Sequence, residues 1–138
     1  MRHLPFRILI VAALAVLTLA CHRQPAVPVW KLEFVSNPTP PVAGALTRFR
    51  CLLTTASGAP VDGAAALLTL VPQAAPHRSM PAGAALHIEL APRGNGIYAG
   101  TGTIRGAGTW EVTLTLSRRG RIQLRRYPLT VAAPAPAS

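Results

Sequence analysis

Two histidines and a methionine in the middle of the chain are the residues best suited to hold a metal. His77 and Met80 stand three positions apart in a proline-rich segment, and His87 follows on a segment of alternating apolar residues. Thioether sulfur and imidazole nitrogen are soft ligands that suit Cu(I). His77, Met80 and His87 are therefore candidate copper ligands. The alternative is that Met80 packs into the end of the domain while both imidazoles are solvated.

Groups that could transfer protons are few. Glu33, Glu89 and Glu111 alternate with apolar residues, and Asp62 lies in a predicted turn. His87 and Glu89 share a face about 7 Å apart along one strand, but without an accompanying nucleophile a surface pair is the simpler interpretation. The chain has no nucleophile elbow, and no Walker loop, dinucleotide fingerprint or zinc-ligand spacing. We therefore predict no catalytic residues and no enzymatic activity.

A basic patch lies near the C-terminus, where five arginines within nine residues straddle a predicted hairpin turn. Such a patch suits an anionic surface, and lipid headgroups or an acidic protein partner would fit it. Nucleic acid fits less well, because single strands also bind through exposed aromatic side chains, only Tyr127 is nearby, and the N-terminal export signal described below places the protein away from nucleic acid. The simpler alternative is a solvated hairpin tip. The five residues are Arg118, Arg119, Arg121, Arg125 and Arg126.

Residues 1–20 form a predicted signal peptide. Arg2 and Arg7 precede an uncharged, mostly apolar run over residues 8–20, which is too short to span a bilayer and typical of an export signal. The run ends in LTLAC, Leu17 to Cys21. This ending resembles the bacterial lipobox, in which a small residue precedes a cysteine that becomes acylated. The alternatives are an ordinary signal peptide with a chance cysteine and an uncleaved membrane anchor.

Acylation of Cys21 would hold the mature chain on a lipid bilayer of the cell envelope, facing the periplasm. Each buried acyl methylene contributes about 0.8 kcal/mol, so two or more chains anchor a protein stably. His22 rather than Asp follows the cysteine, which by resemblance to enterobacterial sorting slightly favours the outer membrane over the inner membrane. Cys51 is then the only other cysteine, so no internal disulfide can form. It alternates with Phe49 and Leu53, and we expect it in the core.

The mature chain is strongly basic. The whole sequence has 14 Lys and Arg against 4 Asp and Glu, a net charge of +10. Removing Arg2 and Arg7 with the leader leaves 12 against 4, or +8. Every basic residue except Lys31 is arginine, which suits anionic partners, although a codon bias toward Ala, Arg and Pro would give the same composition.

The core of the chain, residues 30–131, is predicted to be one all-β domain. Short alternating segments between Gly and Pro turns are typical of a sandwich or barrel, and about seven strands favour an immunoglobulin-like β-sandwich. Residues 21–29 would be the lipidated cysteine and a tether, and residues 132–138 an Ala/Pro tail. We expect Trp110 at the centre of the packing, and we expect the strand that holds Pro128 to be an edge strand or to carry a break there. The predicted strands are 30–35, 46–54, 64–71, 85–90, 97–104, 109–116 and 122–131.

Several motifs in this strand order resemble one family of small bacterial envelope domains. They are PPVAGALTRFR (40–50), GAPVDGA (58–64), MPAG (80–83), GIYAGTG (96–102) and GTWEV (108–112). Together they resemble the YtkA-like family, which is related to FixH-like proteins, over about residues 30–131. The resemblance implies turn or core roles for Gly96, Tyr98, Gly108 and Trp110, and a role in envelope copper handling. Members with a convincing metal site carry more Met and His in the middle loop than this chain does.

The expected function is that of a membrane-anchored envelope lipoprotein acting as a non-enzymatic binding or accessory module, with an envelope protein as its partner. The alternative is a periplasmic copper-binding or copper-delivery protein that uses His77, Met80 and His87. A hydrolase is a third hypothesis, and it would need a pocket holding a carboxylate or histidine with a shifted pKa. No cofactor other than Cu(I) is expected.

Overall fold

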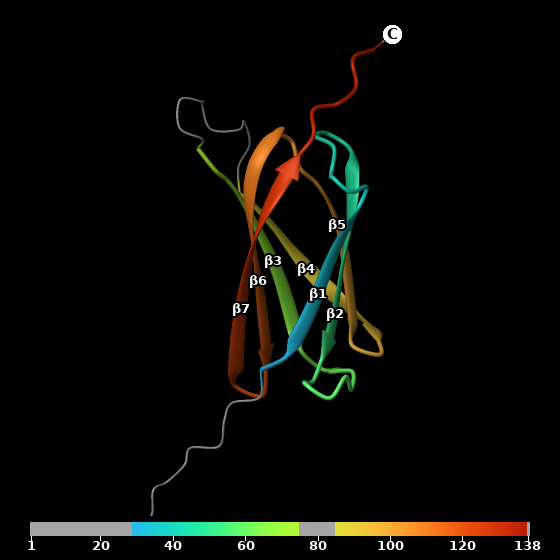
Figure 1. Ribbon diagram of the computed structural model, residues 1–138, viewed down its shortest axis with the longest axis vertical. Coiled ribbons are helices and arrows are strands. Elements are labelled where there is room, and N and C mark those ends of the chain that lie inside the picture. Colours follow the sequence, from blue (N-terminus) through green and yellow to red (C-terminus); the bar gives the residue numbers. More distant parts are fainter. Residues whose placement is uncertain (1–28, 75–84, 138) are drawn as a thin grey trace, which may run out of the picture.

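Seven antiparallel strands make up the described part of the chain (Figure 1). The computed structural model describes residues 29–74 and 85–137. The signal peptide, Cys21, His77 and Met80 lie outside these residues. The all-β prediction is confirmed, and the strand over residues 46–54 is found with the predicted bounds. The strands are β1 (Lys31–Asn37), β2 (Leu46–Thr54), β3 (Ala65–Pro72), β4 (Leu86–Gly94), β5 (Ile97–Thr103), β6 (Gly108–Arg118) and β7 (Arg121–Val131).

No helix among these described residues is long and apolar enough to cross a membrane.

The strands form one curled sheet in the order β1-β2-β5-β4-β3-β6-β7. β4 connects the two halves of the sheet. Its first part, Leu86 to Leu90, pairs with β3, and its second part, Ala91 to Gly94, pairs with β5. This change of partner explains why β4 runs four residues beyond the predicted end at Leu90. The second part has no apolar alternation and is held by its pairing with β5.

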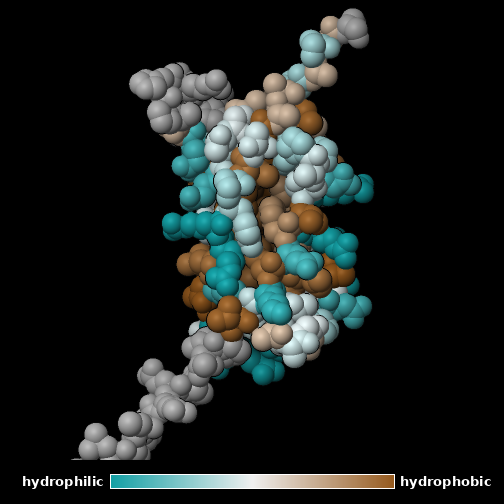
Figure 2. All heavy atoms as spheres, in the orientation of Figure 1, coloured by the Kyte–Doolittle hydropathy of each residue, from teal (hydrophilic) through white to brown (hydrophobic). Residues whose placement is uncertain are grey.

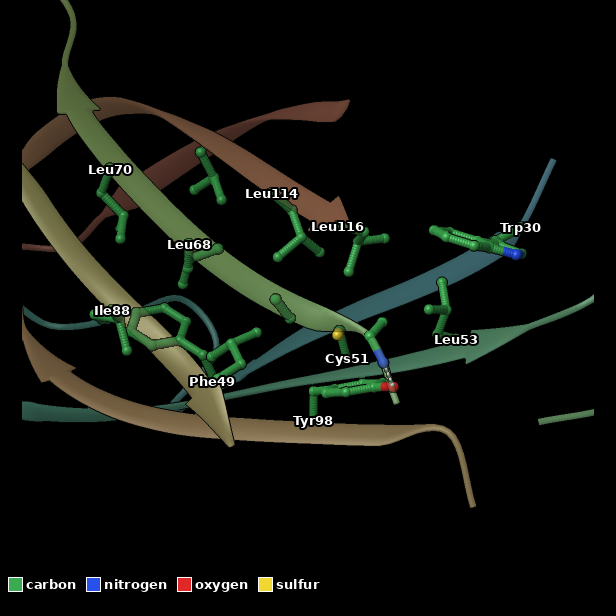
Figure 3. Packing of buried hydrophobic residues seen from close by; sticks show 14 of the residues in the cluster. Trp30, Phe49, Cys51, Leu53, Leu68, Leu70, Ile88, Tyr98, Leu114 and Leu116 are labelled. Atoms are coloured by element: carbon green, nitrogen blue, oxygen red, sulfur yellow. Dashed lines mark hydrogen bonds between the residues drawn. The ribbon is translucent and has the colours of Figure 1, made fainter. Parts of the chain in front are cut away.

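Alternation along the strands builds the core. Phe49, Cys51 and Leu53 on β2 are each fully buried, as predicted, while Arg48 and Arg50 on the alternate positions are exposed. Leu68 and Leu70 on β3 and the inward residues of β6 close the other side. Figure 3 shows these side chains pointing from several strands into one shared interior. Trp110 has the largest side chain among the fully buried residues, which confirms its predicted place in the core, and its indole N–H donates to the carbonyl of Gly106.

β1 and β7, the two ends of the sheet order, are joined through side chains. The amide of Gln123 on β7 accepts a hydrogen bond from the Trp30 backbone N–H at 3.1 Å and donates one to the Trp30 carbonyl at 3.0 Å. The Tyr127 ring stacks on Phe34 with centroids 5.7 Å apart. Pro128 lies on β7 at the end of the strand order, which confirms the prediction of an edge strand.

The loop between β2 and β3 is fastened to β5. The Tyr98 hydroxyl is buried, donates to the Val61 carbonyl at 2.8 Å and accepts from the Ala64 N–H at 3.1 Å. The Asp62 carboxylate accepts from the Gly96 N–H at 2.8 Å. A side chain at Gly96 would collide with the Leu53 carbonyl oxygen, and the φ of Gly96 is +74°. Only glycine fits this point of close approach.

Two tight turns close the β4–β5 and β6–β7 hairpins. Asn95 and Gly96 have φ of 53° and 74°, and Arg119 and Gly120 have φ of 50° and 75°. Positive φ at both turn residues is the geometry that matches the twist of paired strands. Asn and Gly are the residues favoured there, so Arg119 is the unusual member of the four.

Candidate functional site

Only one of the three candidate copper ligands falls in the described residues. His87 is exposed on β4, and its Nδ1 lies 3.2 Å from the Thr69 hydroxyl of the neighbouring strand. Within residues 29–74 and 85–137, no group of three or more His, Cys, Asp or Glu residues is placed to hold a metal ion. A single imidazole does not make a copper site, so the described residues alone do not fit the metal. His77 and Met80 lie outside them.

His87 and Glu89 share the outer face of β4, as the alternation predicted. Both side chains are exposed. Their cross-strand partners on β3 are Thr69, whose hydroxyl is the group bonded to His87, and Leu67, which is apolar.

Cys51 is a core residue. Its side chain has no exposed surface, and burial raises the pKa of its thiol to about 11. The thiolate is the reactive form of cysteine, so at neutral pH this residue is inert, in agreement with its predicted structural role.

The five arginines of the predicted basic patch divide into two groups. Arg118 and Arg121 occupy opposite positions on β6 and β7 where the hairpin ends, and Arg119 lies in the turn itself. Farther along β7, Arg125 stands opposite the buried Leu114 and Arg126 opposite Thr113. Arg125 and Arg126 lie four and five positions beyond Arg121, about 13 Å or more along the strand, so these two arginines stand apart from the turn. We call Arg118, Arg119 and Arg121 the basic tip.

Arg125 instead lies beside Tyr127, on the half-buried side of β7. Burial raises the pKa of the Tyr127 hydroxyl, the Arg125 charge acts to lower it, and the nearby Cys51 adds to the rise. Arg126 lines a small hollow of about 180 Å³ with Glu111 and Pro128.

The basic tip lies at the end of the molecule where the described chain begins. Figure 1 shows the start of β1 and the β6–β7 turn together at the lower end, with the C-terminus at the upper end. Apolar side chains are exposed beside the tip: Ile122 by 70% and Leu124 by 53% of their surface. Figure 2 shows hydrophobic surface at the lower left, over the first residues of β7.

A second arginine cluster lies on the outer face of β1, β2 and β5, where it surrounds a hollow of about 480 Å³. Arg48 and Arg50 come from β2, and Arg93 comes from β4. Strand pairing sets Val35, Arg50 and Ala99 side by side, and sets Asn37, Arg48 and Thr101 in the next row. We call this hollow the arginine groove. Its lining residues are Val35, Ser36, Asn37, Arg48, Phe49, Arg50, Arg93, Ala99, Gly100 and Thr101.

The arginine groove was not predicted from the sequence. The outward direction of Arg48 and Arg50 followed from the alternation of β2, but nothing linked them to Arg93. That residue joins them because β5 lies between β2 and β4 in the sheet, an order that differs from the order along the chain.

The chemistry of the arginine groove is that of anion binding. Its lining provides guanidinium, amide and hydroxyl groups beside apolar surface from Val35 and Ala99. Guanidinium groups stay protonated in proteins, so these arginines can bind and orient an anion but cannot exchange protons with it. Glu33 lies at one end, where it lines a smaller adjoining hollow with Val35, Arg50 and Leu52.

Comparison with known proteins finds no significant match to a protein-family model, a curated protein or a solved structure.

Proposed function

We propose that this protein is a lipid-anchored envelope lipoprotein that acts as a non-enzymatic binding module. Acylation of Cys21 would hold it on the bilayer, and the arginine groove would receive an acidic segment of an envelope partner protein. The leader, the LTLAC sequence and the basic composition support the proposed location at an envelope membrane. The arrangement of the groove supports the binding role.

The observation that carries the proposal is the convergence of Arg48, Arg50 and Arg93 on one hollow. The planar guanidinium fork matches a carboxylate with two parallel hydrogen bonds, which gives both strength and geometric selectivity. The apolar walls lower the effective dielectric around such a pair, so the attraction is stronger than on a fully hydrated surface. A peptide with spaced Asp or Glu residues and one apolar side chain would complement this lining.

The strand order suits an immunoglobulin-like sandwich, which we propose as the finer description of the fold. β1, β2 and β5 would form one layer, β3, β6 and β7 the other, and β4 would contribute to both. The pairing of β4 with β3 and then with β5 supports this division. In such an arrangement the outer face of each layer is free to bind a partner.

Titration with an acidic peptide tests the groove. Binding of a Glu- and Asp-containing decapeptide to the chain of residues 22–138 would be followed by calorimetry for the wild type and for Arg48→Gln/Arg50→Gln. Hydrogen bonds to charged groups contribute about 1.5–3 kcal/mol each, so the variant should bind at least about tenfold more weakly. The matched control is Arg105→Gln/Arg126→Gln, which removes the same charge elsewhere. Equal weakening in both variants would show only non-specific attraction and contradict the proposal.

Copper binding is the second candidate function. The observation in its favour is that the exposed imidazole of His87 lies at the beginning of β4, close in sequence to His77 and Met80. A Cu(I) titration of residues 22–138 would be compared with the His77→Ala/Met80→Ala variant. One-to-one binding that is lost in the variant would support a copper site, whereas no binding or unchanged binding would contradict it.

A further inference from the structure

We propose that the basic tip is a second membrane contact, which binds anionic lipid headgroups and fixes the orientation of the domain on the bilayer. This inference rests on the proposed lipid anchor at Cys21, because the anchor keeps the tip near a membrane. It goes beyond the anchor by assigning a surface of the folded domain to the lipid.

The position of the tip relative to the anchored end is the first argument. Trp30 is the first buried residue of the described chain, and both of its backbone polar groups are bonded to Gln123. Gln123 is two positions from Arg121, the first residue of β7. The path from Cys21 to Trp30 is nine residues, which can reach at most about 32 Å at about 3.3–3.6 Å per residue. The tip is therefore held within a short distance of the membrane, where the effective concentration of headgroups is high.

The composition of this end is the second argument. Lys31 is exposed at the start of β1, so four basic side chains, including those of the tip, gather at the end where the chain begins. Asp62 lies nearby, in the loop where Gly63 approaches Arg118, but its single negative charge leaves the four basic side chains in excess. Ile122, on the opposite face of β7 from Arg121, is exposed at the same end by 70% of its surface. Basic and exposed aliphatic side chains at one end of a domain are the combination that binds the headgroup layer of an anionic bilayer.

The backbone of Arg119 is the third argument. Its φ of 50° is a backbone conformation that residues other than Gly, Asn and Asp seldom adopt. The equivalent position of the other hairpin turn is Asn95, which suits the geometry. A local conformational cost at an exposed position is one that a functional side chain can justify. At this position that use is its positive charge at the outermost point of the hairpin.

Contact through this end would determine how the rest of the domain is oriented on the membrane. β6 and β7 run from the tip to the opposite end, where Gly108 pairs with Val131. The C-terminus lies at that opposite end (Figure 1). The domain would stand on the membrane with its long axis away from the surface, and the arginine groove on its side would stay accessible to a partner.

Vesicle binding of the chain of residues 22–138 tests this contact without the acyl anchor. Every described strand and every buried core residue lies at or after Trp30, so this chain keeps the whole described fold. Sedimentation with vesicles of phosphatidylglycerol and phosphatidylcholine would be compared with phosphatidylcholine alone. We expect binding only to the anionic vesicles, with a loss at high salt because the attraction is screened.

Two double variants with equal charge separate the tip from general attraction. Arg119→Gln/Arg121→Gln should weaken binding by about 20- to 30-fold, since each basic residue at an anionic surface contributes roughly fivefold. Arg105→Gln/Arg126→Gln should change it by less than about twofold, because these arginines lie away from the tip. Circular dichroism and melting temperature would show that both variants are folded.

Equal binding of the two double variants, or no binding of the wild type to anionic vesicles, would overturn the inference. Acylation of Cys21 does not enter this experiment. The two proposals can therefore fail separately. If the tip does not bind lipid, the vesicle sedimentation shows it; if Cys21 is not acylated, the intact mass of the full chain shows it.

Discussion

At the residue scale, the interior holds one polar atom whose cost can be measured. Thr47 on β2 is fully buried, and its hydroxyl has no hydrogen-bond partner among the described residues. Replacing an unpaired buried hydroxyl by a methyl group of the same shape removes a desolvation penalty of about 1–3 kcal/mol. We predict that Thr47→Val raises the free energy of unfolding by about 1 kcal/mol in urea titrations. Thr47→Ser keeps the hydroxyl and loses a methyl group, so it should be destabilising, and a stabilising Thr47→Ser would contradict this explanation.

Cys51 gives the protein a dependence on alkaline pH. Its folded pKa of about 11 lies above the ordinary value of 9.0 because the thiol is buried. Above pH 9 the unfolded chain loses this proton more readily than the folded one, so stability is complete below pH 9 and falls as the pH rises toward 11. The loss is on the order of 2 kcal/mol. Urea titrations between pH 8 and pH 11 should show a steeper decline for the wild type than for Cys51→Ala, and parallel declines would refute this role of burial.

At the element scale, Tyr98 is expected to be the main fastening of the β2–β3 loop. Removing its hydroxyl leaves the Val61 carbonyl and the Ala64 N–H without their buried partner. We predict that Tyr98→Phe lowers the free energy of unfolding by about 2–3 kcal/mol. The control is Tyr127→Phe, which removes a hydroxyl from a half-buried ring and should cost less than about 0.5 kcal/mol. Similar losses for the two variants would argue against a special role for Tyr98.

The β6–β7 turn should become more stable when Arg119 is replaced by a residue that favours positive φ. Arg119→Asn places at φ of 50° a residue that tolerates this conformation. We expect an increase in the free energy of unfolding of about 0.5–1 kcal/mol. Arg105→Asn removes the same charge at a position without positive φ and serves as the control. If Arg119→Asn also weakens vesicle binding, the same residue is shown to trade stability for membrane contact.

The elements also show how far the sequence could predict the structure. The alternation of Phe49, Cys51 and Leu53 defined β2 and its buried face. When one face of a sheet is buried, shifting the strand by one residue would expose all of its apolar side chains, so only one register is stable. The pairing of β4 with two different strands could not be predicted, since the residues after Leu90 carry no alternation. The contact between Gln123 and Trp30 could not be predicted either. It is made by a side-chain amide bonding to a distant backbone, and such a contact leaves no periodic pattern in the sequence.

At the scale of the whole molecule, candidate sites depended on strand order. The basic tip was predictable because its arginines are neighbours along the chain, on a turn marked by Gly120. The arginine groove was not, because Arg93 reaches Arg48 only through the curled sheet. The resemblance to YtkA-like domains and the copper site stay predictions. The strands described here position His87 alone among the proposed ligands.

The membrane anchor is the central claim about where the protein acts, and the proposed role of the basic tip rests on it. The most direct measurement is the intact mass of the full chain expressed in a bacterium, beside Cys21→Ala. We predict a mature chain that begins at Cys21 and carries the added mass of acyl chains, with membrane association that Cys21→Ala abolishes or leaves dependent on an uncleaved leader. A wild-type chain that retains the leader, or that is cleaved without acyl groups, would contradict the account.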